Sequence, residues 1–109
     1  MKSIWQEITL HGHKVSWHSQ WNYMYYYVYV LQNLDDKSLY IGFTTNIKQR
    51  LSDHQSGKGS TVTRKKKNWE LIYFEGYKNK KDALSREKFL KGGSGRKYIN
   101  KQLYNYMKP

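Results

Sequence analysis

The feature that most limits the possible fold of this chain is a pair of short segments rich in aromatic and β-branched residues. A helical pattern follows them at once. Residues 23–31 (YMYYYVYVL) are too short for a typical helix and have the composition of a β-strand. The turn sequence NLDDKS separates them from a second strand, SLYIGF, so the pair predicts a β-hairpin. Folded about Leu34 and Asp35, this hairpin would set Tyr29 directly opposite Tyr40, with Cβ atoms about 5 Å apart.

The segment after the second strand predicts a short helix that presents two polar side chains together. Thr45 or Asn46 is suited to cap its N-terminus, and Gly57 occupies the usual glycine position after its C-terminus. Arg50 and His54 are spaced i, i+4 and are therefore neighbours on one side of this helix. The strand, turn and helix thus hold a fixed cation and a titratable imidazole close to the hairpin.

The rest of the chain predicts one more strand and two more helices. Residues 69–77 (WELIYFEGY) read as a third strand, with Leu71, Tyr73 and Glu75 on one face. Residues 80–91 (KKDALSREKFLK) predict a helix, and GGSG predicts a flexible break before a last helix over residues 97–107.

One carboxylate of the predicted helix over residues 80–91 falls on its apolar side. On a helical wheel Ala83, Leu84 and Leu90 form the core stripe, and Glu87 lies inside the arc that they define. An unpaired buried charge would cost several kcal/mol, so Glu87 needs a partner. An arginine or a metal ion would satisfy it, and the residue pattern alone leaves both open.

The composition limits the classes of protein. A chain of 109 residues forms one small domain, and without cysteine it has no disulfide, no thiolate nucleophile and no cysteine-ligated zinc. It has neither an apolar run of 18 or more residues nor a secretory signal pattern, so we expect a cytoplasmic protein that does not enter the membrane.

The charge balance points to a polyanionic partner. Twenty Lys and Arg residues against eight Asp and Glu give a net charge of +12. Nucleic acid is favoured over an acidic membrane, because the basic residues do not follow one amphipathic helix. Residues 57–68 (GKGSTVTRKKKN) predict a basic loop, which is either a solvated surface or a clamp for the phosphate backbone. Its candidate nucleic-acid-binding residues are Lys58, Arg64, Lys65, Lys66 and Lys67.

The first 22 residues differ from the rest of the chain. They hold three of the four histidines and three of the four tryptophans with little net charge, and we interpret them as an N-terminal extension before a domain over residues 23–109. His11 and His13 could ligate a metal, but no further ligand follows at a recognisable spacing, so a surface segment is the favoured interpretation.

From about residue 25 to residue 103 the chain resembles the GIY-YIG nuclease superfamily. It is most similar to small stand-alone bacterial members that resemble the nuclease domain of the excision-repair incision subunit. The two tripeptides appear as VYV (residues 28–30) and YIG (residues 40–42), with valines in place of glycine and isoleucine in the first; Phe43 stands where some members have lysine. The ordered set carries the resemblance: these tripeptides, Arg50, His54, the block TRKKKNWELIYFE and Glu87 within LSREKFLK.

The resemblance implies an α/β fold, a three-stranded antiparallel sheet flanked by helices. It also implies metal-dependent hydrolysis of a DNA phosphodiester bond, in repair or in the processing of structured DNA. Glu87 would hold one Mg²⁺ or Mn²⁺ ion, which makes a salt bridge the minority reading for this residue. The residues matching the family's site are Tyr29, Tyr40, Arg50, His54 and Glu87, with Gly42 beside them and Asn100 or Asn105 as a further candidate.

The chemistry gives each of these residues a role. Tyr29 could take a proton from the attacking water, but a free phenol titrates near pH 10, so His54, Arg50 or a metal-bound water would have to favour the phenolate. Arg50 offers forked donors to a phosphate, and Tyr40 could hydrogen-bond the phosphate or the nucleophile. Gly42 would allow a close approach beside the tyrosines.

A different class of function stays open, a non-catalytic nucleic-acid-binding module that keeps the fold. Branched, damaged, single-stranded and duplex DNA, as well as RNA, all fit the residue pattern. The pattern predicts no particular protein partner and no oligomeric state.

Overall fold

The computed structural model describes residues 7–10, 13–16 and 25–109, which form two antiparallel sheets. Strands β1 (Glu7–Leu10) and β2 (His13–Ser16) pair with each other. The larger sheet has the order β4-β3-β5, with β3 (Tyr26–Asn33) at its centre between β4 (Leu39–Thr44) and β5 (Trp69–Tyr77). His11 of the predicted metal-binding pair lies outside the described residues.

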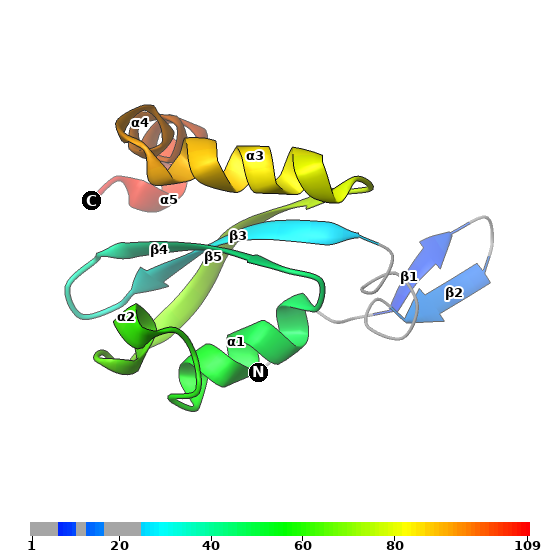
Figure 1. Cartoon of the computed structure of the whole chain (residues 1–109), viewed down its shortest axis with the longest axis horizontal. Coiled ribbons are helices and arrows are strands. Elements are labelled where there is room, and N and C mark those ends of the chain that lie inside the picture. Colours follow the sequence, from blue (N-terminus) through cyan, green and yellow to red (C-terminus); the bar gives the residue numbers. More distant parts are fainter. Residues whose placement is uncertain (1–6, 11–12, 17–24) are drawn as a thin grey trace.

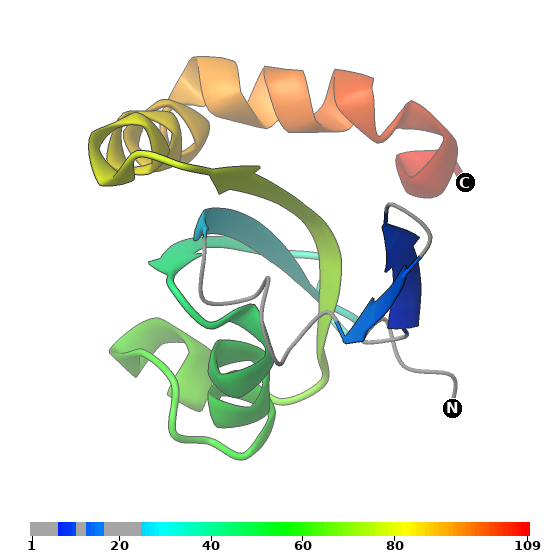
Figure 2. The same ribbon diagram turned by 90° about the vertical axis from the view of Figure 1, so that its right-hand side faces the viewer.

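Helices cover both faces of the three-stranded sheet (Figure 1). On one face lie α1 (Ile47–Gln55) and α2 (Thr61–Arg64); on the other lie α3 (Lys80–Lys91), α4 (Gly93–Gln102) and α5 (Tyr104–Met107). Figure 2 shows the same layers from the side. The predicted α/β class, a three-stranded antiparallel sheet flanked by helices, is confirmed. None of the helices in the described part of the chain is both long and apolar enough to span a membrane.

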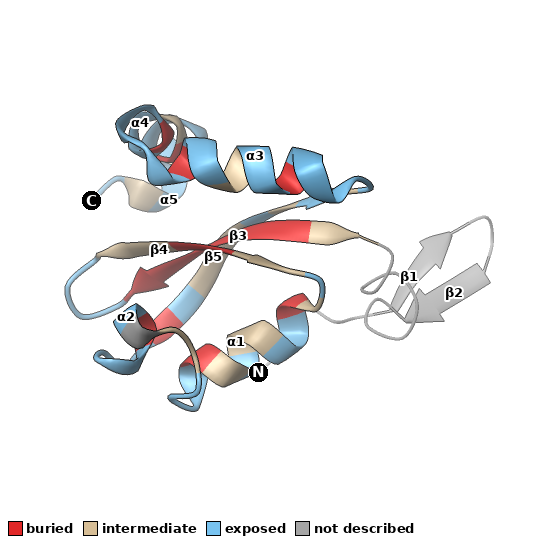
Figure 3. Ribbon diagram, viewed as in Figure 1, coloured by how far each residue is buried: buried red, intermediate tan, exposed pale blue. Residues whose placement is uncertain are grey.

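The central strand β3 separates two cores (Figure 3). Its side chains alternate between the faces, and residues 27–33 are all buried. Val28 and Val30 pack with buried residues of α3 and α4. Tyr27, Tyr29 and Leu31 pack on the α1 side, and the strand therefore carries its central tyrosine into the smaller core beside α1.

The hairpin register differs from the prediction that Tyr29 faces Tyr40. Tyr29 pairs with Gly42, and Tyr40 pairs with Leu31. Asn33 sets this register, because its side-chain oxygen accepts hydrogen bonds from the backbone N–H groups of Asp35 and Asp36, at 3.0 and 3.2 Å. The turn is thus centred one residue later than predicted. Since the shift moves the partner by two positions, both phenols still lie on the same face.

A β-bulge changes which face part of β5 presents. Val30 pairs with Tyr73, but the next residue, Leu31, pairs with Leu71, so Ile72 is the additional residue. Leu71 packs in the α1-side core, whereas Tyr73 packs on the side of α3. The prediction that these two side chains share a face was therefore wrong, because a strict alternation does not continue through a bulge.

Four further predictions about helices need correction. The predicted basic loop contains a single helical turn, α2, capped by Ser60. Leu84 is 40% exposed and does not belong to the core stripe of α3. The predicted flexible break is instead the start of α4, where a Cβ atom on Gly95 would lie 2.3 Å from the carbonyl oxygen of Leu90. The glycine at this position serves the close packing of α3 and α4, and the predicted last helix is divided into α4 and α5.

Candidate active site

The hydroxyl of Tyr29 shares a buried hydrogen bond with His54. The phenolic oxygen lies 2.8 Å from Nε2 of the imidazole, and the two residues are only 2% and 3% exposed. Tyr29 comes from the central strand, and His54 comes from the last turn of α1. Asn46 fixes the start of this helix, since its side chain accepts a hydrogen bond from the backbone N–H of Gln49. Strand and helix thus bring together two residues 25 positions apart.

The second ring nitrogen of His54 is also hydrogen-bonded. Nδ1 lies 2.8 Å from the hydroxyl oxygen of Thr63, which is fully buried in α2. A backbone contact fixes Thr63, because the indole N–H of Trp69 donates to the Thr63 carbonyl oxygen at 3.1 Å. The sequence analysis did not predict a role for Thr63. It treated this segment as a basic loop and included the threonine only as the first residue of the block TRKKKNWELIYFE.

Two glycines allow this group of side chains to approach closely. A Cβ atom on Gly42 would lie 2.3 Å from the end of the Tyr29 ring, which passes directly over the glycine. A Cβ atom on Gly59 would lie 2.3 Å from Nδ1 of His54 and 2.4 Å from the Thr63 hydroxyl. Any larger residue at either position would displace a ring. Gly42 was expected near the tyrosines, whereas the role of Gly59 was not foreseen.

Tyr40 completes the aromatic part of the site. Its ring packs edge-on against His54 with centroids 5.1 Å apart, and its centroid lies 6.3 Å from that of Tyr29. On the other side it contacts Trp69, with centroids 6.4 Å apart. Tyr40 is only half-buried, and its ring closes the site around the imidazole.

The electrostatics of the site favour neutral forms of both hydrogen-bonded partners. Burial raises the pKa of the Tyr29 phenol well above its usual value, and neighbouring Tyr40 adds to this shift. Burial also lowers the pKa of His54 below its usual value of 6.5, and the positive charge of Arg50 lowers it further. A neutral phenol therefore faces a neutral imidazole near pH 7. Of the groups expected to favour a phenolate, Arg50 does lower the pKa of Tyr29, but the effect of burial is larger.

Three charged groups act on this pair: Arg50 and Asp53 act on both Tyr29 and His54, and Glu87 acts on Tyr29. Arg50 is half-buried on α1 and forms no ion pair with any residue that the structure describes. Glu87 lies on α3, and its negative charge contributes to the raised pKa of Tyr29. Its side chain is 19% exposed, and one carboxylate oxygen lies 3.2 Å from the ammonium group of Lys91. The side chain of Lys91 is itself 56% exposed, so this ion pair can open to solvent.

Among the predicted site residues, Glu87 is the carboxylate that could hold a metal ion. Within the described residues no three or more His, Asp or Glu side chains are grouped to hold a cation. Mg²⁺ accepts such a site, since it commonly keeps several waters and binds one or two carboxylates together with substrate phosphates. Glu87 is half-buried and has its described ion pair through one oxygen only. The residues present therefore fit a hydrated Mg²⁺ or Mn²⁺ ion.

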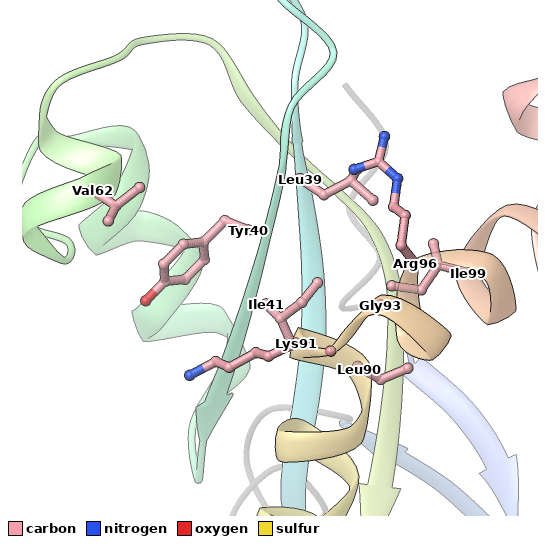
Figure 4. A pocket seen from close by; sticks show the side chains of 10 residues that line it. Leu39, Tyr40, Ile41, Val62, Leu90, Lys91, Gly93, Arg96 and Ile99 are labelled. Carbon is pink, nitrogen blue, oxygen red and sulfur yellow. The ribbon is translucent and has the colours of Figure 1, made fainter.

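An open hollow of about 570 Å³ lies along the edge strand β4 (Figure 4). Tyr40 enters it from β4 and Val62 from α2, whereas Lys91 and Arg96 enter it from α3 and α4. Its floor is largely apolar, with Ile41 and other buried side chains. The ammonium group of Lys91 and the hydroxyl of Tyr40 point to the same side. A ligand here would contact elements from both faces of the sheet.

Other predicted site residues lie apart from the Tyr29–His54 pair. Asn100 is exposed on α4, where it lines a second hollow of about 690 Å³ together with Gln32 and Lys37. The candidate nucleic-acid-binding residues 58 and 64–67 are all exposed. Lys66 is held by Asp36 at 2.6 Å, so one cation of the basic run already has a partner.

Comparison with known proteins gives the family. The model of the GIY-YIG catalytic domain matches residues 25–102. The chain belongs to the GIY-YIG catalytic domain family. It is 40% identical over 85 residues to a UPF0213 protein of Pediococcus acidilactici, an alignment that covers 76% of this chain and 81% of the relative. A UPF0213 protein of Clostridium perfringens is 43% identical over 65 residues, covering 60% of this chain and 69% of the relative.

A solved relative is also known, the solution NMR structure of a UPF0213 protein of Bacillus halodurans. It is 34% identical to this chain and covers 77% of it, with 86% of the solved chain aligned. The TM-score is 0.46.

The two tripeptides of this GIY-YIG domain are adjacent in space, on β3 and β4. Tyr29, Tyr40 and Gly42 lie on the α1 side, because they occupy alternate positions of two paired strands. Val28 and Val30 point to the other side and are completely buried in the core beneath α3. The substituted letters of the first tripeptide are therefore core positions, and the valines there leave the tyrosine side of the motif unchanged.

Proposed function

We propose that this GIY-YIG domain is an endonuclease that hydrolyses a phosphodiester bond of DNA with the help of a divalent metal ion. The observation that carries the proposal is the 2.8 Å hydrogen bond between the Tyr29 hydroxyl and Nε2 of His54. It pairs a buried phenol with a buried, neutral base next to an arginine that has no ion pair among the described residues. The net charge of +12 supports a polyanionic substrate.

In the proposed reaction a proton moves along this hydrogen bond. A water molecule gives its proton to the Tyr29 oxygen as its own oxygen attacks the phosphorus atom, while the phenolic proton passes to Nε2 of His54. His54 becomes the imidazolium and Tyr29 stays neutral throughout. The raised pKa of Tyr29 then presents no obstacle, since no free phenolate has to accumulate. The bond from phosphorus to the leaving oxygen breaks, and solvent protonates that oxygen.

The charges around the pair have complementary roles in this proposal. Arg50 would donate hydrogen bonds from its planar fork to non-bridging phosphate oxygens. The Tyr40 hydroxyl would bind the same phosphate from the hollow along β4. Glu87 would hold Mg²⁺ or Mn²⁺, which as a Lewis acid stabilises charge that develops on the leaving oxygen. We place the activity in DNA repair or the processing of structured DNA, as the family resemblance implies.

One observation favours a second function, a nucleic-acid-binding module without cleavage. Glu87 already has a cation beside it, since the ammonium group of Lys91 lies 3.2 Å from its carboxylate. In a module of this kind Glu87, Tyr29 and Tyr40 would be structural residues, and the positive surface would provide the affinity.

The test is cleavage of a labelled panel of duplex, single-stranded, flap, nicked and four-way-junction DNA together with RNA. The natural protein is compared with Glu87→Gln in the presence of Mg²⁺ or Mn²⁺. Asp82→Asn is the matched control, because it removes a carboxylate from an exposed position of the same helix. Metal-dependent cleavage that Glu87→Gln abolishes and Asp82→Asn retains would support the proposal. Equal binding by all three proteins with no cleavage of any substrate would favour the binding module.

A further inference from the structure

The hydroxyl of Thr63 lies where it can decide which nitrogen of His54 carries the proton. A neutral imidazole has one N–H group, and the other nitrogen accepts. Nε2 faces Tyr29 and Nδ1 faces Thr63, both at 2.8 Å. Only a proton on Nδ1 leaves the lone pair of Nε2 free for the phenol. Whether His54 can act as a base toward Tyr29 therefore depends on the contact with Thr63.

The surroundings of Thr63 favour the protonated Nδ1. The hydroxyl proton of Thr63 has a carbonyl acceptor, the backbone oxygen of Ser60, at 3.3 Å. The hydroxyl oxygen of Ser60 is an alternative acceptor at 3.3 Å, and it also accepts the backbone N–H of Thr63. When the Thr63 proton points to either oxygen of Ser60, its own oxygen is an acceptor for Nδ1–H. In the reverse arrangement the Thr63 hydroxyl would donate to an unprotonated Nδ1 and could no longer donate to Ser60. Because a carbonyl cannot donate, the first arrangement satisfies one more acceptor.

Tyr29 gives an independent argument for the same tautomer. Its hydroxyl is buried, and Nε2 of His54 is its one hydrogen-bond partner within the described ranges. If Nε2 carried the proton, it would donate to the phenolic oxygen and leave the phenolic O–H without an acceptor. A buried donor without a partner is unfavourable, because it has lost its hydrogen bonds to water and gained none in the protein. The Nδ1–H tautomer avoids this cost because Tyr29 then donates to Nε2.

We propose that Thr63 is a positioning residue that holds His54 as the Nδ1–H tautomer, with the Nε2 lone pair directed at the Tyr29 hydroxyl. This inference rests on the proposed function only for its catalytic consequence. The tautomer itself is a property of the resting protein and needs neither substrate nor metal. In catalysis the same contact would keep Nε2 ready to accept the phenolic proton, as orienting partners do for other histidine bases.

The fold holds Thr63 in place from three sides. Ser60 caps the single turn of α2. The indole of Trp69 donates to the Thr63 carbonyl oxygen at 3.1 Å. Gly59 leaves room for both His54 and Thr63, since a Cβ atom there would lie within 2.4 Å of each side chain. The short helix α2 thus connects the basic segment to the imidazole, and the buried hydroxyl of Thr63 is the point of contact.

The test is a nitrogen-15 NMR measurement of the His54 ring in the full chain near pH 7.5. His54→Gln identifies its signals among those of the four histidines. We expect a protonated Nδ1 and an unprotonated Nε2 in the natural protein. In Thr63→Val, which has nearly the same shape, Nδ1–H would lack an acceptor, so the share of the Nε2–H tautomer should rise even though Tyr29 still favours Nδ1–H. Thr63→Ser keeps the hydroxyl and should keep the natural tautomer.

Cleavage measured on the same variants adds the catalytic consequence. Thr63→Val should lower the single-turnover rate about 10- to 100-fold, the usual effect of losing an orienting partner, and Thr63→Ser should restore most of it. An Nε2–H tautomer in the natural protein would overturn the inference, and this result is accessible even if Thr63→Val does not fold. An unchanged tautomer in folded Thr63→Val would also overturn it. Absence of cleavage in every form, with the predicted tautomers present, would contradict only the proposed function.

Discussion

The two faces of the three-stranded sheet each surround a polar group with tyrosines, but they balance charge differently. On the α3 side Arg86 donates two hydrogen bonds to the carboxylate of Glu75, at 2.9 and 3.0 Å. Tyr73 and Tyr77 donate to the same carboxylate. The guanidinium of Arg86 also stacks over Tyr98, 4.3 Å from the ring centroid. Every charge in this cluster has a partner inside the protein.

The cluster on the α1 side is neutral where it is buried. Tyr29, His54 and Thr63 form a chain of hydrogen bonds, and neighbouring Arg50 has no ion pair with a described residue. Glu87, whose charge also acts on Tyr29, lies on α3 and is paired with an exposed lysine. Arg50 is therefore available to bind a phosphate from outside the protein, and Glu87 is available to bind a cation.

The comparison shows why similar residues serve different purposes. Although burial alone would raise the pKa of Glu75, the hydrogen bonds from Arg86 and the two tyrosines hold it below its usual value. That carboxylate stays charged and satisfied, which suits a role in stability. On the α1 side burial keeps Tyr29 protonated and His54 neutral, so a proton can be transferred between them. Substitutions on the two faces should therefore separate activity from stability.

The largest effect is expected from Tyr29→Phe. Removing the hydroxyl leaves the ring in the core but removes the group that would take the proton of water, so the cleavage rate should fall about 10²- to 10⁴-fold. Tyr104→Phe is the matched control, because Tyr104 is 64% exposed on α5 and should keep the full rate. Single-turnover rates at saturating protein give the comparison, and equal rates for the two variants would contradict the role of Tyr29.

The opposite face should respond in stability. Glu75→Gln removes the charge that faces Arg86 in a half-buried cluster and should lower the free energy of unfolding by about 2–4 kcal/mol, toward the lower part of the range for broken buried pairs. The folded fraction should still cleave DNA at the natural rate. Urea unfolding measures the first effect and single-turnover cleavage below the transition measures the second. A large loss of rate with unchanged stability would place this cluster in the active site.

A smaller effect on stability is expected at the glycine beneath the tyrosine ring. Gly42→Ala forces the Tyr29 ring away from a Cβ atom that would lie 2.3 Å from it. The free energy of unfolding should fall by about 1–3 kcal/mol, as for other overpacked sites, and cleavage should fall because the hydroxyl moves away from His54. Gly93→Ala meets no atom within 4 Å and should be neutral or slightly stabilising. Thermal unfolding measures the stability of both variants. A loss for Gly42→Ala alone would indicate close packing against the Tyr29 ring, whereas an equal loss for both would contradict it.

The smallest effect concerns the basic run at residues 64–67. Lys65→Gln removes an exposed cation with no ion pair among the described residues, so the slope of log binding constant against log salt should decrease by about 0.7–0.9 if it contacts one phosphate. Lys66→Gln should change the slope less, because Lys66 is paired with Asp36. Fluorescence titrations of a labelled oligonucleotide at several salt concentrations measure both slopes. A larger change for Lys66 would show that DNA displaces Asp36.

The sequence predicted the elements of the fold well where the signal was local. The strands at residues 26–33, 39–44 and 69–77 and the helix at residues 80–91 follow from aromatic, β-branched and helical patterns, and Asn46 caps α1 as expected. The hairpin register did not follow, because the Asn33 side chain organises the turn. The bulge at Ile72 and the packing of Gly95 against α3 depend on contacts distant in the sequence.

The site was predicted in part, through the family motif. Tyr29, Tyr40 and His54 meet as ring contacts, and Glu87 acts on the phenol through its charge. Thr63 was not assigned a role, because a threonine before a basic run resembles any solvated loop residue and only the fold brings its hydroxyl to the imidazole. Asn100 stays a prediction, since it lies beside a different hollow on α4.

The pH dependence of single-turnover cleavage tests the central claim, that Tyr29 gives its proton to a neutral His54, most directly. Because the pKa of His54 is lowered below 6.5, the imidazole is an available base at and above this pH. The account predicts that the rate increases with pH in the acidic range and is constant from about pH 7 to pH 9. It also predicts that His54→Gln removes the pH dependence in the acidic range. A rate that instead continues to rise tenfold per pH unit through this range in both proteins would show that a phenolate is the base, and would contradict the account.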